Sequence, residues 1–300
     1  MTDHGRKPAR WANDLNAILD VTHTRKRFPV PVEELALEYS RLKFPSDPIV
    51  AIDGGQLPNF EGALYSVHDG KAWAILYNEA VSDGRRRFTI AHEFGHFLMH
   101  RTLRPDGFRC SEKDVTFRAG VDMEQEADTF AAYLLMPFND FRERLPADVV
   151  PSLDDLSAMA ERYGVSLISC IVRWLEYTER RSMLVISIDD YILWSKSSDT
   201  AFKSGLYYKT RGVVPVEVPS QSLVSRKDMA DIAREGVEHP AGVWLGESCT
   251  EITIHSDKYG QTITILHYGR ESARWRHGDE PDEVDAFDRF SAKSRDRFGD

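Results

Sequence analysis

Cysteine is scarce in this sequence, since the 300 residues include only Cys110, Cys170 and Cys249. The three are far apart and odd in number, which excludes a CxxC zinc knuckle and disfavours a disulfide framework. The N-terminal residues lack the apolar segment of a signal peptide, and no apolar run approaches the ~18 residues of a membrane span. We therefore expect a cytoplasmic protein without membrane contact. Histidines and carboxylates would have to bind any metal that it holds.

Basic residues are also in the minority. Lys plus Arg total 38 against 48 Asp plus Glu, so the formal net charge is −10. A protein that coats nucleic acid needs a basic surface to neutralise phosphates, and this charge balance disfavours DNA as a partner. With 42% hydrophobic and 29% charged residues, the remaining composition is typical of a globular chain long enough for two or three domains.

Hydrophobic periodicity and turn residues predict an α+β fold. We expect residues 1–9 to be flexible and residues 10–150 to form a mainly helical domain with a small β-hairpin or sheet. We expect residues 151–180 to form a helical bundle that imitates a helix-turn-helix. We expect residues 181–270 to form a small α+β domain, and no motif indicates its role. Residues 271–300 contain nine acidic and six basic residues, which is typical of a disordered tail.

Two helices and a hairpin are predicted where the first domain is most informative. Asp69-Gly70 lies between two apolar runs and indicates a hairpin of residues 63–68 and 71–77. One helix is expected over about 85–100, after a cap at Ser82 or Asp83. Another is expected over about 122–136 and ends at a proline.

The first of these helices contains His92-Glu93-Phe94-Gly95-His96. Positions i and i+4 lie on one helix face, so His92 and His96 can both reach one Zn²⁺ ion. Glu93 lies beside that ion and is placed to take a proton from water instead of binding metal. Gly95 in a helix interior costs about 1 kcal/mol relative to Ala, and close approach of another backbone would explain it. The alternative, two ordinary histidines on a helix, is the less favoured interpretation.

A zinc hydrolase needs a third protein ligand and an open fourth position. The helix over 122–136 offers Glu124, Glu126 and Asp128. Glu126 shares a stripe with Phe130 at i+4, and a carboxylate on a core-facing stripe is costly unless a cation meets it. Glu126 is therefore the preferred third ligand. Asp128 could orient a ligand histidine, although solvated charge is the simpler interpretation for it and for Glu124.

His100 continues the face of His92 at i+8. It could bind the metal, but its spacing is long for a ligand, and a structural or outer role is preferred.

These two segments resemble the ImmA/IrrE metallopeptidases. The resemblance rests on the sequence from Arg87 to His100 and on the sequence from Glu124 to Pro137, in this order. It implies a zincin-like peptidase domain over 10–150 in which His92, His96 and Glu126 bind Zn²⁺ and Glu93 is the catalytic base. Asp128 departs from the family, which often has Asn there. The resemblance further implies that the substrate is a helix-turn-helix transcriptional repressor, in stress response or mobile-element regulation.

Strand 71–77 and the helix after Gly164 each allow a functional and a simpler structural interpretation. Strand 71–77 could be an edge strand that pairs with an extended substrate, although an ordinary core strand would look the same. The helix after Gly164 carries a single basic residue, Arg173, so a packing bundle is preferred over a DNA reader.

The sequence thus favours a zinc-dependent endopeptidase. The runner-up is a regulator that binds a repressor or a small signal without cleaving it, with a structural or vestigial metal site. A DNA-binding regulator is the weakest hypothesis for so acidic a chain.

Overall fold

The computed structural model describes residues 5–22, 27–57, 60–104, 107–109, 118–210, 214–226, 230–256 and 260–270. These residues fall into two compact units. The first contains the residues up to Phe141 together with Met159–Ser166, and the second contains Arg142–Ala158 and the residues from Leu167 onward. Helices and sheets are both abundant, which confirms the α+β fold class.

The division between the units falls inside the segment 151–180 for which we predicted a separate bundle. The predicted tail, residues 271–300, lies outside the described residues, as do residues 1–4 of the predicted flexible N-terminus. None of the helices in the described part of the chain is both long and apolar enough to cross a membrane.

Two helices of the first unit begin where the sequence supplies the usual signals. The first turn of α2 contains acidic residues. Before α3, the side-chain hydroxyl of Ser82 accepts a hydrogen bond from the backbone N–H of Arg85. The helices are α1 (Pro8–Thr22), α2 (Val32–Lys43), α3 (Asp83–His100) and α4 (Arg118–Leu135), followed by α5 (Phe138–Arg144) and α6 (Leu153–Tyr163), which reach the division between the units.

The sheet of the first unit has the order β1-β3-β2-β4. Its strands are β1 (Ile49–Gly55), β2 (Gly62–Val67), β3 (Ala72–Asn78) and β4 (Gly107–Arg109). The hairpin predicted around Asp69-Gly70 is present, with β2 and β3 antiparallel. Our prediction that strand 71–77 lies at an edge is wrong, because β1 pairs with β3 in parallel on its other side.

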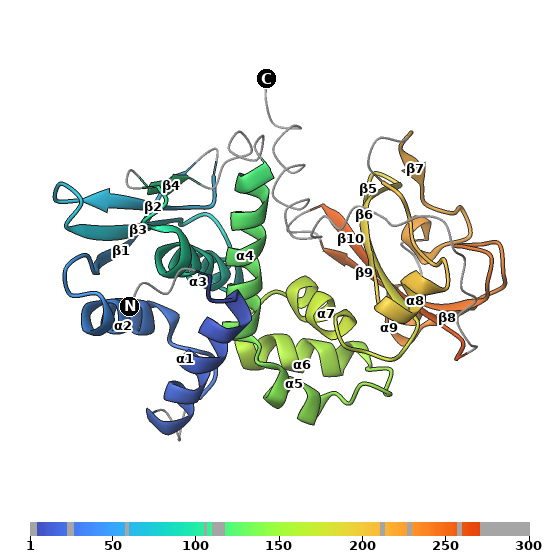
Figure 1. The fold of residues 1–300 in the computed structure, drawn as a ribbon. Helices are drawn as coiled ribbons and strands as arrows, with labels where there is room; N and C mark the ends of the chain where they lie inside the picture. The colour runs from blue at the N-terminus through green and yellow to red at the C-terminus, as the bar shows by residue number, and fades with distance from the viewer. Residues whose placement is uncertain are drawn as a thin grey trace. The chain divides into compact units, whose positions relative to one another are not determined.

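Helix α3 contacts β2 and β3 and also packs along α4 (Figure 1). Its buried residues run from Phe88 to Leu98 without interruption and include His100. A helix that is buried all round in this way cannot leave its polar side chains to solvent, so each of them must find a partner inside the unit.

The second unit is built on a six-stranded sheet with the order β7-β6-β5-β10-β9-β8. Antiparallel pairing places β10 between β5 and β9. The elements are α7 (Leu167–Leu175), β5 (Ser182–Ile188), β6 (Tyr191–Ser197), α8 (Asp199–Lys203), β7 (Val216–Glu217), the 3-10 turn η2 (Leu223–Ser225), α9 (Ala230–Glu235), β8 (Val237–His239), β9 (Cys249–Ser256) and β10 (Gln261–Tyr268).

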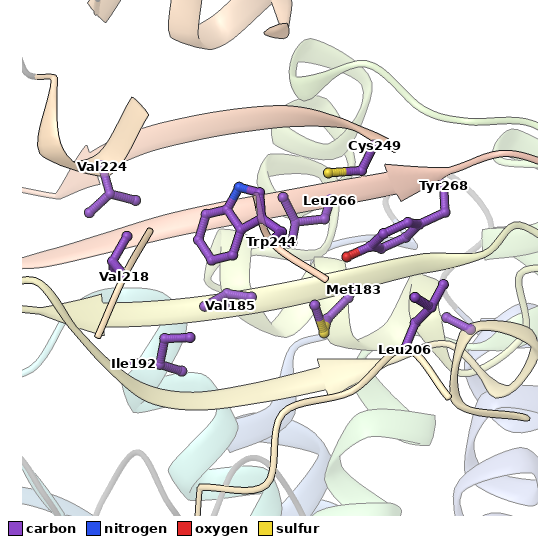
Figure 2. Packing of buried hydrophobic residues seen from close by; sticks show 11 residues of the cluster. Met183, Val185, Ile192, Leu206, Val218, Val224, Trp244, Cys249, Leu266 and Tyr268 are labelled. Atoms are coloured by element: carbon purple, nitrogen blue, oxygen red, sulfur yellow. The ribbon is translucent and has the colours of Figure 1, made fainter. Parts of the chain in front are cut away.

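Both faces of this sheet are covered. One face carries the apolar cluster shown in Figure 2, which includes Met183, Val185, Leu266 and Trp244. Helix α7 contacts β5 and β6, and all of its residues from Ser169 to Leu175 are buried. This burial fits the packing role that we preferred for the helix over a role in reading DNA.

Candidate metal centre

Helix α3 brings three histidines and one glutamate into the interior of the first unit. His92 is 8% exposed, and Glu93 and His96 are fully buried. The Nε2 atoms of His92 and His96 lie 3.0 Å apart, as the i and i+4 spacing on one helix face requires. The two predicted histidine ligands therefore converge on one point.

The carboxylate that joins them comes from Glu124 on α4. Its Oε2 lies 3.2 Å from His92 Nε2, and its Oε1 lies 3.2 Å from His96 Nε2. These three side chains form a group that could hold a metal ion, with all ligand atoms within 4.8 Å of one another. Packing of α3 against α4 creates the group.

Our expectation that Glu126 completes the site does not agree with this geometry. Glu126 directs its Oε2 at His100 Nε2, 2.8 Å away, and its side chain is 50% exposed. The stripe of α4 that is buried contains Ala127, Ala131 and Leu134. Glu124 lies on the Ala127–Ala131 side of that stripe and Glu126 lies at its far edge, so the correction follows from the rotation of the helix.

Asp128 of α4 contacts His92 at the ring nitrogen that does not face Glu124. Its Oδ1 lies 2.7 Å from His92 Nδ1, and its side chain is buried. A carboxylate only accepts, so Nδ1 of His92 donates here and the lone pair of Nε2 faces the metal group. Such contacts orient ligand imidazoles in many metal sites, and this is the outer role that we weighed for Asp128.

Burial affects the protonation of the histidines in and beside the metal group. Burial is the main cause that lowers the pKa of His96, to about 4, and it also lowers the pKa of His100. Burial therefore favours the neutral imidazole of His96, which is the form that a metal ligand needs.

The donor set fits zinc. Two imidazole nitrogens and one carboxylate are a ligand combination that catalytic zinc sites use, with a fourth position left for water or substrate. Ligand bonds of 2.0–2.1 Å in a tetrahedron place donor atoms about 3.3 Å apart. The observed separations of 3.0 to 3.2 Å are close to that value. The accepting atoms of His92 and Glu124 would repel one another without a cation between them.

Glu93 is buried against the sheet. A β-carbon built on Gly62 of β2 would lie 2.9 Å from Glu93 Oε1 and 2.4 Å from Thr89 Cγ2. Glycine at this position therefore leaves room for the Glu93 carboxylate, a role that the sequence did not reveal because residue 62 lies far from the histidine motif.

Gly95 has the role that we expected, a close approach of another backbone. A β-carbon there would lie 3.3 Å from Ala127 Cα and 3.0 Å from Phe130 Cδ1. The neighbouring backbone is that of α4, so Gly95 lets the two helices that carry the metal group come together.

Phe108 of β4 is a further site residue that sequence reasoning missed. Its ring stacks on that of His96, with centroids 4.5 Å apart and an interplanar angle of 17°. The short strand β4 holds Phe108 opposite Leu64 of β2. Only the fold brings this segment to the histidine, and no spacing in the sequence could have indicated it.

A family model and a solved structure are each similar to part of this chain. Residues 54–175 match the model of the IrrE N-terminal-like domain, Peptidase_M78. No curated protein sequence matches the chain. Among solved structures, a Mycobacterium tuberculosis transcriptional regulator is similar over 85% of this chain and 76% of its own, with 17% identity and a TM-score of 0.47. Residues 54–175 are thus similar to the IrrE N-terminal-like domain of this peptidase family, in agreement with the resemblance.

Proposed function

We propose that the protein is a zinc-dependent endopeptidase and that its substrate is a helix-turn-helix transcriptional repressor. The observation that carries the proposal is the convergence of His92, His96 and Glu124 inside a segment that matches a peptidase family. The choice of substrate is supported by the resemblance to ImmA/IrrE proteins. The acidic charge of the chain agrees with a protein partner better than with DNA.

His92, His96 and Glu124 would hold the zinc ion, with Asp128 orienting His92. Zinc in such a site supplies Lewis acidity, which polarises a carbonyl oxygen and acidifies water. Glu93 follows a ligand directly in the sequence and is enclosed by β2. Its carboxylate takes a proton from the attacking water. It then gives that proton to the amine nitrogen as the peptide C–N bond breaks.

The test compares Glu93→Gln with the unchanged protein. Both are incubated with the helix-turn-helix repressor encoded nearest to the gene, and cleavage is followed by mass on a gel, after zinc content has been measured. We expect one zinc per chain in both proteins and a loss of cleavage of about 10²–10⁴-fold in the variant. Glu38→Gln, the same substitution on the exposed face of α2, is the matched control and should cleave normally.

Two results would contradict the proposal. Cleavage that survives in Glu93→Gln removes this carboxylate from the mechanism. A repressor that co-elutes intact with the zinc-loaded protein supports the runner-up hypothesis, a regulator that binds without cleaving.

A further inference from the structure

A line of two contacts leads from the metal group to the surface on the side of His96 away from Glu124. His96 Nδ1 lies 3.0 Å from His100 Nδ1. His100 Nε2 lies 2.8 Å from Glu126 Oε2. His96 is fully buried and His100 is 2% exposed, whereas half of the Glu126 side chain is in contact with solvent.

The donors and acceptors along this line are not free to vary. An ionised carboxylate only accepts, so His100 Nε2 carries the proton that Glu126 accepts. A neutral imidazole with Nε2 protonated has its lone pair on Nδ1. The short contact between the two Nδ1 atoms has room for a single proton, and that proton must then belong to His96. His96 Nε2 is left with the lone pair that a metal ligand needs.

The opposite arrangement would disable the ligand. If His100 carried its proton on Nδ1, it would donate to His96 Nδ1, and the proton of His96 would move to Nε2. An N–H group would then point at His92 and Glu124, where the metal must bind. The position of the proton on His100 therefore depends on Glu126, whose carboxylate accepts it at Nε2.

Each predicted ligand histidine thus has a carboxylate behind it, but by different routes. Asp128 contacts His92 directly. Among the described residues, the neighbour of His96 Nδ1 is His100 rather than a carboxylate, and His100 bridges the gap to Glu126. Phe108 stacks on His96, and its ring centroid is 6.0 Å from that of His100, which restrains both rings in the orientation that the line requires.

We propose that Glu126 and His100 are positioning residues that fix the tautomer of His96, with Nδ1 protonated and Nε2 free to bind metal. The value of this arrangement to the protein rests on the proposed function, because a metal ligand is what it prepares. The tautomer itself is a property of the metal-free chain. It also explains why an acidic residue that is not within the metal group occupies position 126.

The decisive measurement is ¹⁵N NMR of the metal-free full chain labelled on histidine, with the His96 signals assigned by their loss in His96→Gln. We expect His96 in the unchanged protein to be protonated on Nδ1 and unprotonated on Nε2. In Glu126→Ala, which alters a half-exposed side chain and should fold normally, a second tautomer should appear. Glu126→Gln retains a carbonyl oxygen that can accept from His100 and should restore the original pattern.

Zinc affinity gives a second measurement that does not depend on proteolysis. By competition with a chromogenic chelator, we expect Glu126→Ala to bind zinc about 10–100-fold more weakly, the usual effect of losing an outer partner of a ligand histidine. Glu126→Gln should recover most of the affinity. Glu38→Ala, on the exposed face of α2, should bind as the unchanged protein does.

A His96 tautomer and a zinc affinity that are both unchanged in Glu126→Ala would overturn the proposal. So would a Glu126→Gln variant that behaves like the alanine variant. If the tautomer shifts as expected while the zinc-loaded protein cleaves nothing, the positioning role is supported and the proposed peptidase function fails, so the two failures are distinguishable.

Discussion

Two carboxylates, one partly buried in the first unit and one fully buried in the second, show opposite ways of keeping a charge inside a protein. Glu124 in the first unit has two imidazole Nε2 atoms as its near neighbours. Glu251 on β9 in the second unit is fully buried and surrounded by donors. Its Oε1 accepts from Ser222 Oγ and the backbone N–H of Leu223.

The donors around Glu251 come from several elements of the second unit. Thr253 Oγ1 also donates to Oε1, at 2.7 Å, and the indole N–H of Trp244 donates to Oε2 at 2.8 Å. His239 Nε2 lies 2.8 Å from the same oxygen. This carboxylate is thus satisfied by the chain itself and has no need of a ligand.

The difference teaches how to separate a metal site from a polar core. Acidity and at least partial burial are common to both positions. What distinguishes Glu124 is that the atoms facing it are lone-pair acceptors, on the tautomers that Asp128 imposes on His92 and that we propose for His96. Converging acceptors repel one another unless a cation lies between them. Converging donors instead satisfy the hydrogen-bonding capacity of a carboxylate. Three predictions test this contrast.

The largest effect is expected at Glu251. In Glu251→Ala the donors of Trp244, Ser222 and Leu223 remain buried without their acceptor, and we predict a loss of about 3–5 kcal/mol in the free energy of unfolding. Urea dependence of hydrogen exchange in peptides from β9 would measure it. Glu251→Gln, which keeps a carbonyl acceptor, should lose less. Equal losses in the two variants would contradict the role given to the carboxylate oxygens.

Zinc should stabilise the first unit and leave the second unchanged. At a free zinc concentration 100 times the dissociation constant, the gain is about 2.7 kcal/mol. Hydrogen exchange of peptides from α3 should report it, and Glu124→Ala should abolish it, because the variant removes a ligand. Glu38→Ala is the control. A similar gain in peptides from β9, or one that persists in Glu124→Ala, would break the contrast between the two carboxylates.

A third effect is a pH dependence in the second unit. His267 donates or accepts at Ser182 Oγ, 2.8 Å away, and burial together with the charge of Arg180 lowers its pKa to about 4. The unfolded chain takes up a proton near the ordinary value of ~6.5, but the folded chain does not. The free energy of unfolding therefore falls as pH decreases from about 6.5 to 4.

The slope from His267 alone approaches about 1.4 kcal/mol per pH unit within that window. His267→Gln should flatten it in a comparison of urea unfolding curves between pH 7 and 4. A slope that is the same in both proteins would show that His267 is not the group responsible.

Most elements of the first unit could be predicted from local signals. The hairpin followed from Asp69-Gly70, and α3 followed from its cap and its periodicity. Strand β1 was missed, and with it the inner position of β3, because parallel pairing depends on residues distant in the sequence. The pairing of β4 with β2, which places Phe108 on His96, has the same long-range origin.

The third residue of the metal group shows how far periodicity can be trusted. The prediction that Glu126 is the third ligand rested on the apolar residues of one side of the helix only. At 100° per residue, the buried positions of α4 centre about 40° from Glu124 and about 120° from Glu126. These positions are Ala127, Asp128, Phe130, Ala131, Leu134 and Leu135. A count over the whole helix would have favoured Glu124, whereas no count could have shown the contact of Glu126 with His100.

The close contact between Gly95 and the backbone of α4 has a consequence for how this site can change over generations. Both helices are held in fixed rotation where they touch, so a single residue inserted between Glu124 and Ala127 would turn the carboxylate about 100° away from the histidines. Loops at the ends of the two helices can lengthen or shorten without that penalty. The two motifs are therefore inherited as one rigid part, and the connection between them is constrained where β4 places Phe108 on His96.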